Sequence, residues 1–440
     1  MIEKNRLLEI LFEWNIWHRD VKEFSGIKRD IIRNIKLHLE DNEIITIIGS
    51  RRAGKSTLMF QIMEELLSKG VEKEQFLYIN FEEPAFSQYL NLDLLIRIYK
   101  VYREEINLEK RPYIFLDEVQ NLPLWEKWVR AKHDLRQAKI FVTGSSSKLL
   151  SSEFSTVLTG RHLSYSIYPL SFSEFMRFNN VKILTKADEI RQKTRLRKLL
   201  KEYMHFGGYP KVVLTNNERS KKEILKQYFE DILYRDIIER YKIREISVLR
   251  NMAIYYLTNM SNLSSYNRIK KILNVSMDVA RNYSTYFSEA FLLKEVPKFS
   301  FKVSQHIMNP KKIYAVDHGL RNAISFRFSE DLGRIAENIV FNELSRQDGE
   351  IYYFKNKNEV DFIFRQGMAI SGQYQVTFSD LEDELLFERE IKGILQLSEK
   401  YNLNKATIIT EDKDDVMNIN NVKIFFISLI NWLLQRDDRT

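Results

Sequence analysis

The first 180 residues alternate between short apolar runs and longer amphipathic stretches. An apolar run of about four to eight residues is typical of a buried strand, whereas apolar residues three or four positions apart predict a helix. The pattern predicts strands at residues 44–48, 75–81, 112–116 and 139–142, and helices at 57–67, 92–105 and 125–135. This alternation predicts an α/β domain. Residues 1–43 contain Trp14 and Trp17 among short apolar runs, and we expect them to pack on the sheet.

The middle of the chain has a different pattern. Residues 180–241 are predicted to be helices with Lys- and Arg-rich exposed faces, interrupted by a turn at Gly207-Gly208-Tyr209-Pro210. Three helices and two strands are then predicted, the helices at 248–259, 266–273 and 277–289 and the strands at 292–296 and 299–303, turned at Pro297-Lys298. This order of elements is that of a winged helix-turn-helix.

The last third of the chain returns to mixed α/β patterning. It predicts a strand at 312–317, a helix at 333–344, a hairpin of 351–354 and 359–364, and a strand at 373–378, before a helix and two further β/α elements. We therefore divide the chain into residues 1–179, 180–242, 243–305 and 306–440.

The clearest chemical signal lies between the first predicted strand and the helix that follows it. It fits the pattern G-x-x-x-x-G-K-[ST] and consists of Gly49, Ser50, Arg51, Arg52, Ala53, Gly54, Lys55 and Ser56, with Thr57 opening the helix. Strand, glycine loop and helix in this order direct backbone N–H groups and the positive end of a helix dipole at a polyphosphate. Lys55 can bridge the β- and γ-phosphates, and Ser56 can place its hydroxyl on Mg²⁺. ATP and Mg²⁺ are therefore the expected cofactors.

Two acidic residues, Asp117 and Glu118, close the third predicted strand, 62 residues after Lys55. This is the arrangement of a Walker B motif. Asp117 is expected to hold the Mg²⁺ shell and Glu118 to polarise the attacking water. The next strand also ends in polar residues, and Thr143 or Ser145 could contact the γ-phosphate. The alternative is a Gly/Ser turn without such a contact; we assign Ser145 to the nucleotide site.

Arg161 follows in the stretch Leu158-Thr159-Gly160-Arg161. An arginine at this point could stabilise transition-state charge on the γ-phosphate, either in its own chain or from a neighbouring subunit. The alternative is a surface arginine in an ion pair. We assign Arg161 as the candidate arginine finger.

The motifs GSRRAGKS, YIFLDEVQ, FVTGSSS, LTGR and YPLSFSEF occur in this order, and HFGGYP and YRDI follow downstream. Together they resemble the archaeal and bacterial AAA+-type ATPases that carry a C-terminal restriction-endonuclease-like domain. The resemblance covers essentially the whole chain. It implies an αβα P-loop NTPase sandwich at 1–179, a helical lid at 180–242, the winged helix at 243–305 and a PD-(D/E)XK nuclease-like domain at 306–440. It also implies a homo-oligomer, with a hexameric ring as one form.

The basic charge of the chain is concentrated in the predicted winged helix. The net charge is +8, and residues 242–302 contain ten basic and four acidic residues, an excess of +6. Arg281, Asn282, Tyr283, Ser284 and Tyr286 lie on its third helix, and Lys294, Lys298 and Lys302 on its wing. Such a surface can contact phosphates and groove edges, so double-stranded or branched DNA is the expected partner. The alternative is a module that packs on the lid or on a neighbouring subunit.

The PD-(D/E)XK resemblance implies Glu337 on a helix and Asp361 in a hairpin as metal-binding carboxylates. Gln375 and Thr377 stand where that family has E-x-K, so the pattern is broken. Gln offers a neutral oxygen where Glu offers full charge. Thr cannot supply the lysine cation that stabilises developing negative charge. We therefore expect a degenerate domain with a scaffold or DNA-docking role. The alternative for Glu337 and Asp361 is a pair of solvated polar positions.

Composition excludes several classes of site. The chain has no Cys, which excludes disulfides and Cys-ligated metals. Its longest apolar stretch, residues 424–434, is interrupted by Ser428 and Asn431 and is too short to span a bilayer. The N-terminus has no signal-peptide pattern.

We expect a cytoplasmic ATPase that couples hydrolysis to DNA binding or remodelling. The alternatives are a nucleotide-gated switch with slow hydrolysis and a DNA nuclease with a variant metal site.

Overall fold

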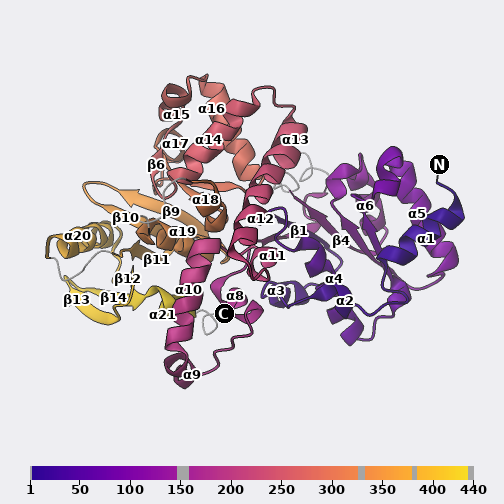
Figure 1. Ribbon diagram of the computed structural model, residues 1–440, viewed down its shortest axis with the longest axis horizontal. Helices are drawn as coiled ribbons and strands as arrows, with labels where there is room; N and C mark the ends of the chain where they lie inside the picture. The colour runs from indigo at the N-terminus through magenta and orange to yellow at the C-terminus, as the bar shows by residue number, and fades with distance from the viewer. Residues whose placement is uncertain (1, 146–157, 326–331, 379–383, 435–440) are drawn as a thin grey trace. The chain divides into compact units, whose positions relative to one another are not determined.

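The computed structural model describes residues 2–145, 158–325, 332–378 and 384–434. The chain forms two compact units. The first contains the residues up to Tyr168 together with Glu289–Phe291, and the second contains Pro169–Ser288 and Leu292–Thr440. Figure 1 shows the elements of each unit along the chain.

The first unit is built on a parallel five-stranded sheet. Its strands are β1 (Ile44–Gly49), β2 (Phe76–Asn80), β3 (Tyr113–Asp117), β4 (Lys139–Gly144) and β5 (His162–Ile167), in the order β2-β3-β4-β1-β5. The helices that connect them are α4 (Lys55–Ser68), α5 (Leu92–Glu105) and α6 (Trp125–Asp134). All six residues of β1 are buried, as expected for a central strand covered on both faces. The predicted α/β fold is confirmed.

The residues that precede β1 form α1 (Lys4–Trp14), α2 (Lys22–Ser25) and α3 (Ile32–Lys36). They pack on the sheet, as the sequence predicted. The Trp17 indole N–H donates to the Phe76 carbonyl oxygen at 2.7 Å. The Asn15 side chain accepts from the Tyr78 N–H at 2.7 Å and donates to the Tyr78 carbonyl at 3.0 Å. Because β2 is an edge strand, these bonds satisfy backbone groups that would otherwise lack a partner.

The second unit begins with helices. They are α8 (Phe172–Phe178), α9 (Lys186–Arg191), α10 (Lys193–Phe206), α11 (Pro210–Val213) and α12 (Glu218–Asp231), which continues through a π-helical segment at Ile232–Ile238 into α13 (Glu239–Tyr241). The predicted turn at Gly207-Gly208 is confirmed. Its Gly208 N–H donates to the Asp317 carboxylate at 2.8 Å. A Cβ on Gly208 would lie 2.4 Å from the Leu170 carbonyl oxygen, which explains the glycine at this close approach.

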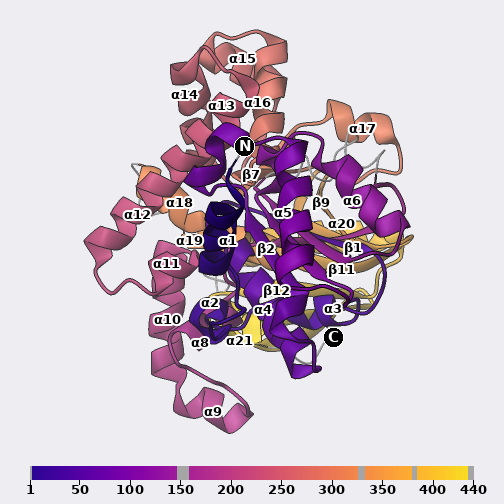
Figure 2. The same ribbon diagram turned by 90° about the vertical axis from the view of Figure 1, so that its right-hand side faces the viewer.

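Three helices and a small sheet follow, and two views show the helices grouped together (Figures 1 and 2). The helices are α14 (Ile246–Thr258), α15 (Tyr266–Leu273) and α16 (Met277–Glu289), close to their predicted bounds. The strands β6 (Leu263–Ser264), β7 (Leu293–Val296) and β8 (Lys311–Ala315) form an antiparallel sheet in the order β6-β8-β7. We call α14 to β8 the three-helix module.

Two predictions for this module are wrong. Residues 299–303 do not form the second strand of a hairpin with 292–296, because β7 pairs with β8, and α17 begins at Val303 and ends at Met308. The Phe299 N–H donates instead to the Tyr353 carbonyl. The Phe299 ring packs in the hydrophobic core of the C-terminal mixed sheet described below, which together with its helices we call the last domain. The predicted boundary between residues 305 and 306 also fails, because it separates β7 from β8 within one sheet.

The chain ends in a six-stranded mixed sheet. Its strands are β9 (Glu350–Lys355), β10 (Glu359–Gln366), β11 (Ala369–Val376), β12 (Lys405–Thr410), β13 (Asp415–Ile419) and β14 (Val422–Ser428), in the order β13-β14-β12-β11-β10-β9. The helices are α18 (His318–Ile324), α19 (Leu332–Leu344), α20 (Glu384–Tyr401) and α21 (Leu429–Leu434). Ile363 of β10 packs with Ile394 of α20, while the adjacent Phe362 stacks on Phe341 of α19. Helices therefore pack on both faces of β10.

Candidate nucleotide site

The predicted phosphate loop connects the end of β1 to the start of α4. Its two glycines are required by geometry. A Cβ on Gly49 would lie 2.1 Å from the Ile167 carbonyl oxygen of β5, so any side chain would push the loop off the sheet. Gly54 has a φ of 100° and precedes the first residue of α4. Only glycine adopts this backbone angle without strain. The helix therefore begins directly behind the loop, with its free N–H groups facing the loop.

Lys55 is the first residue of α4 and is only 4% exposed. Its ammonium donates to the carbonyl oxygens of Gly49 and Ser50 at 3.3 and 3.4 Å. It also lies 3.4 Å from the Glu118 carboxylate. The lysine of the loop and the acid that follows β3 are thus neighbours, although they are 63 positions apart in the sequence.

Asp117 is the last residue of β3 and is 1% exposed. Hydroxyl groups surround it. Tyr78 donates to its carboxylate at 2.6 Å, Thr143 of β4 donates to the other carboxylate oxygen, and Ser56 of the phosphate loop also bonds to it. Burial, and then the negative charge of Glu118, raise the pKa of Asp117. The site therefore holds a buried carboxylate beside the phosphate loop.

Glu118 has a positive φ of 53°, in the left-handed region that a non-glycine residue adopts at a cost. Its N–H donates to the Thr143 hydroxyl at 3.0 Å, which helps to hold this conformation. Gln120 donates to its carboxylate at 2.6 Å. Burial acts to raise the pKa of Glu118, but the nearby Lys55 and the bond from Gln120 outweigh it and lower that pKa. Glu118 is consequently a charged carboxylate directed at the phosphate loop.

The structure distinguishes the two polar candidates at the end of β4. Thr143 bonds to both Asp117 and the backbone of Glu118, so it belongs to the acidic centre. Ser145 follows β4 and is fully buried. The order β3-β4-β1 places β4 between the strand that leads into the phosphate loop and the strand that ends at Asp117.

Arg161 does not lie at this site. It precedes β5, and the β1–β5 register pairs Ile44 with His162 at one end and Gly49 with Ile167 at the other. Arg161 is therefore at the end of the sheet opposite the phosphate loop, about 17 Å away at the usual rise per strand residue. Its guanidinium donates to Asp134 at 2.8 Å and helps to lower the pKa of that carboxylate to about 2. The prediction of a finger acting within its own chain is wrong, because strand direction carries Arg161 away from the phosphates.

The sequence analysis missed Arg29, which supports the phosphate loop from outside the motif. Its guanidinium donates to the Ala53 carbonyl in the loop and to the Tyr168 carbonyl after β5, both at 2.7 Å. Arg29 is 4% exposed, and its N–H donates to Gln61 of α4 at 3.1 Å. The only signal in the sequence was a basic residue within an otherwise apolar lead-in, which does not reveal its partners.

Replacing Arg29 with alanine is expected to destabilise the first unit by about 2–4 kcal/mol, because two buried carbonyl groups lose their charged donor. The affinity for ATP should also fall, since Ala53 is part of the loop. Urea denaturation and titration with a fluorescent ATP analogue would measure both effects. Arg33→Ala, at an exposed position of α3, is the matched control. Equal behaviour of the two variants would contradict the assigned role.

A second polar cluster lies in the last domain. Glu337 of α19 and Asp361 of β10 are brought together, as the resemblance implied, but they converge on a lysine that the sequence analysis missed. Lys312 of β8 is 2% exposed. Its ammonium lies 2.7 Å from Asp361, 2.8 Å from Glu359 and 3.0 Å from Glu337. Tyr314 also donates to Glu337 at 2.6 Å. The alternative that Glu337 and Asp361 are solvated positions is wrong.

The two residues that break the E-x-K pattern are buried beside this cluster. Gln375 accepts from the Asp361 N–H at 3.1 Å and donates to Glu390 of α20 at 2.7 Å. Thr377 is 4% exposed, and its N–H donates to the Ile409 carbonyl. In the part of the chain that is described, no group of three or more His, Asp or Glu side chains has the arrangement of a metal site.

The buried cluster predicts a dependence of stability on pH. Burial and the nearby Asp361 raise the pKa of Glu337 to about 7. The folded state then holds a proton that the unfolded chain releases near pH 4.5. The resulting stabilisation is complete below pH 4.5 and lost as the pH rises to about 7, a change of about 3 kcal/mol. Urea denaturation between pH 4 and 8 should show this loss in the wild type but not in Glu337→Gln. Parallel pH profiles would contradict the assignment.

The predicted DNA-binding face of α16 is only partly exposed. Arg281 and Asn282 are exposed, but Tyr283 and Ser284 are buried. Ser284 bonds to Tyr256 at 2.8 Å, and Tyr286 stacks on Tyr241 with ring centres 3.7 Å apart. Tyr283 and Ser284 were therefore wrongly placed on a DNA-binding surface, because they lie on the side of the helix that packs into the module.

The basic residues expected on the wing also differ in exposure. Lys302 is exposed, Lys298 is half-buried, and burial lowers the pKa of Lys294. Lys294 lies in β7 and is paired with Tyr314 across the sheet. The exposed basic surface of the module is consequently narrower than the sequence suggested.

Comparison with known proteins agrees with this nucleotide site. Residues 41–176 match the model of the AAA domain family. Residues 197–331 match a domain of unknown function, DUF8612. The chain belongs to the same family as the uncharacterized protein MJ1544 of Methanocaldococcus jannaschii, with which it is 38% identical over 407 residues, 90% of this chain and 88% of that protein.

Two more distant similarities extend across most of the chain. An uncharacterized protein of Haemophilus influenzae is 28% identical over 406 residues, 91% of this chain and 96% of that protein. Among solved structures, the ORC1 protein of Aeropyrum pernix in complex with DNA aligns with a TM-score of 0.33 and 10% identity, over 69% of this chain and 94% of that one. None of the helices in the described ranges is long and apolar enough to cross a membrane.

Proposed function

We propose that this protein binds ATP with Mg²⁺ and hydrolyses it. The observation that carries the proposal is the approach of Lys55 to Glu118, 3.4 Å apart, at the point where the phosphate loop meets the end of β3. A cation that binds phosphate and a carboxylate that can orient water are the two parts that phosphoryl transfer to water requires. Both are buried and held by specific partners, as expected of preorganised groups.

Each residue of the site has a defined task. The backbone N–H groups of residues 49–54, together with Thr57 at the start of α4, surround the phosphates. The Lys55 ammonium offsets their negative charge. Glu118 orients the attacking water and accepts its proton. Thr143 positions Glu118 and Asp117 through its bonds to both. Ser145, beyond β4, contacts the γ-phosphate side of the site.

The residues present also fit a magnesium ion. Asp117 is a buried carboxylate that has hydroxyl donors but no ion pair among the described residues. A hard cation with oxygen ligands would offset the cost of burying this charge. Ser56 and Asp117 would hold the ion. When bound, it supplies positive charge that offsets the charge of the phosphates.

Replacing Lys55 with alanine tests the binding step. The affinity for a fluorescent ATP analogue is expected to fall at least tenfold, because a charge-assisted contact to the phosphates is lost. Lys69→Ala is the matched control, since Lys69 follows the same helix and forms an exposed ion pair with Glu40. An unchanged affinity in Lys55→Ala would mean that the loop does not bind phosphate.

The proposed function includes DNA binding by the three-helix module. Its topology, with helices α14, α15 and α16 and the sheet order β6-β8-β7, supports assignment as a winged helix. Residues 180–242 act as the helical lid. The basic excess of residues 242–302 supports a polyanionic partner. Titration of labelled single-stranded, duplex and branched DNA at several salt concentrations tests this, with no binding as the contrary result.

Homo-oligomerisation, including a hexameric ring, is part of the same proposal. Arg161 cannot serve its own site, but its side chain is 31% exposed and would be available to a neighbouring subunit. Hydrolysis per chain should then rise with protein concentration, and Arg161→Ala should remove that rise. Sedimentation velocity with and without ATP provides the independent measure of assembly. A monomer with concentration-independent turnover would contradict a finger acting between subunits.

The last domain is proposed to keep a PD-(D/E)XK-like fold without nuclease activity. The residues do not fit a divalent cation, because the Lys312 ammonium lies between the carboxylates that would bind it. Thr377 removes the lysine of the motif, and Gln375 is engaged with the Asp361 backbone and Glu390. Supercoiled DNA incubated with Mg²⁺ or Mn²⁺ should stay intact. Cleavage that disappears in Asp361→Ala would contradict this and establish a variant nuclease.

A further inference from the structure

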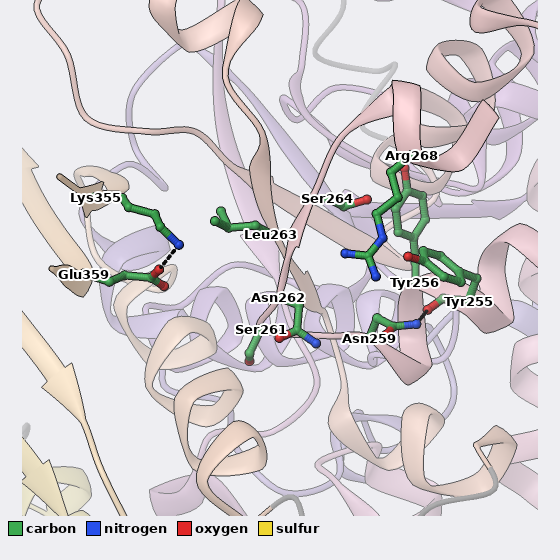
Figure 3. Close-up of a pocket in the computed structure, with 10 residues that line it drawn as sticks. All are labelled: Tyr255, Tyr256, Asn259, Ser261, Asn262, Leu263, Ser264, Arg268, Lys355 and Glu359. Atoms are coloured by element: carbon green, nitrogen blue, oxygen red, sulfur yellow. Dashed lines mark hydrogen bonds and ion pairs between the residues drawn. The ribbon is translucent and has the colours of Figure 1, made fainter. Parts of the chain in front are cut away.

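A polar pocket lies within the second unit, between the three-helix module and the β9–β10 hairpin (Figure 3). Its volume is about 370 Å³, which is within the range of ligand sites. One side is formed by the end of α14, by β6 and by Arg268 of α15. The other side is formed by Lys355 and Glu359, the residues that end β9 and begin β10. Neither element closes the pocket alone.

The pocket contains donor groups without partners. The Arg268 guanidinium forms no hydrogen bond or ion pair with any described residue, and Figure 3 shows it directed into the space between the two sides. The Asn262 side-chain amide, across from it, likewise has no bond within the described ranges. The Ser264 hydroxyl also lines the pocket, but it bonds to Tyr256 and is not a free donor. Donors that converge on one space without acceptors favour an anionic ligand.

Glu359 is the only acid among the described residues that line the pocket, and it is already neutralised. Glu359 receives Lys355 at 3.0 Å through one oxygen and lies 2.8 Å from Lys312 through the other. Lys355 therefore compensates this acid, because the charge of Lys312 is shared with Glu337 and Asp361. With Arg268 added, the groups around the pocket carry net positive charge at neutral pH. The ion pair also fixes Lys355 at the edge opposite Arg268, as Figure 3 shows.

We propose that this pocket binds one backbone phosphate of single-stranded DNA, with Arg268 as its principal ligand. The proposal rests on the DNA binding proposed above. It places one contact between the protein and DNA in this pocket rather than on α16. A duplex is too wide for a pocket of this volume, whereas one nucleotide fits. Tyr255 lines the same pocket as Arg268, and aromatic rings together with cations are the usual elements of single-strand sites.

The test compares Arg268→Ala with Lys271→Ala in full-length protein. Both remove one exposed cation from α15, but Lys271 does not line the pocket. Both variants carry Lys55→Ala, which weakens phosphate binding at the P-loop. Fluorescence anisotropy with a labelled 25-nucleotide single strand is measured from low to high salt. Circular dichroism verifies folding, which is expected to be unaffected because the Arg268 side chain has no bonds to lose.

Arg268→Ala is expected to weaken binding about tenfold and to reduce the salt-dependence slope by about 0.7, the value for one phosphate contact on a single strand. Lys271→Ala should change binding less than threefold. Equal effects of the two variants would overturn the pocket while leaving DNA binding intact. Absence of DNA binding in the parent protein would instead overturn the proposed DNA function and the pocket with it. Competition by inorganic phosphate or a mononucleotide at micromolar concentration, lost in Arg268→Ala, would overturn single-stranded DNA as the ligand.

Discussion

Replacing Glu118 with glutamine is expected to lower ATP turnover by about 10²–10⁴-fold while leaving ATP bound. Glutamine keeps the size of the side chain and its bond from Gln120, but it cannot accept a proton from water. Lys55, freed from its 3.4 Å contact with a charged carboxylate, remains available to the phosphates. The variant should therefore bind ATP at least as tightly as the wild type and should accumulate the nucleotide-bound state.

Release of phosphate under saturating ATP measures turnover, and a fluorescent ATP analogue measures affinity. Glu109→Gln, at an exposed surface position of the same unit, is the matched control. If turnover falls only a few-fold in Glu118→Gln, Glu118 does not activate water. If affinity for the ATP analogue falls together with turnover, Glu118 instead helps to hold the phosphate loop in place.

Replacing Lys312 with methionine is expected to destabilise the second unit by about 3–5 kcal/mol. Lys312 is buried and lies between Glu337, Glu359 and Asp361, so its removal leaves buried negative charges without a partner. Methionine fills a similar volume, which separates the loss of charge from the creation of a cavity. The loss should appear as a lower midpoint in urea denaturation.

The triple variant Lys312→Met, Glu337→Gln, Asp361→Asn should recover much of this stability, because the isosteric neutral side chains no longer require a cation. Lys392→Met is the control, since its pair with Glu388 on α20 is exposed and contributes about 1 kcal/mol or less. A Lys312→Met midpoint equal to that of the control would contradict the role of Lys312. If the triple variant has no higher urea midpoint than Lys312→Met, the unpaired carboxylates are not the cause of the lost stability.

The nucleotide site could be predicted because its residues lie either in one continuous sequence motif or at the end of a strand. Gly49 and Gly54 are required by close approach and backbone angle, and these requirements are readable from spacing. Asp117 ends a buried strand and Glu118 follows it, so their meeting with Lys55 required only that β1 and β3 be parallel strands of one sheet, with β4 between them. The helices α14, α15 and α16 were likewise specified by local apolar periodicity.

Other features depended on pairing between distant segments. β7 pairs with β8 rather than with residues 299–303, because Phe299 packs in the core of the last domain. The same pairing carries Lys312 into the carboxylate cluster, a position that no local pattern reveals. Arg161 was misplaced because the motif gives its residue type but not the end of β5 at which it lies.

The polar surface was the least predictable part. Tyr283 and Ser284 were grouped with Arg281 by their place on one helix, but the helix turns them toward the module interior. Arg29 and Arg268, in contrast, were given no role by the sequence analysis. A single arginine in sequence has many potential partners, and only the surrounding backbone shows that Arg29 is fully bonded within the phosphate-loop region while Arg268 faces a pocket.

Steady-state ATP hydrolysis, with single-stranded, duplex and branched DNA added in turn, tests the central claim most directly. The account predicts Mg²⁺-dependent hydrolysis that at least one of these DNA forms stimulates, with both basal and stimulated rates lost in Glu118→Gln. Hydrolysis indifferent to every DNA, with no DNA bound, would contradict the coupling and favour a nucleotide-gated switch. Absence of hydrolysis under all conditions would contradict the ATPase itself.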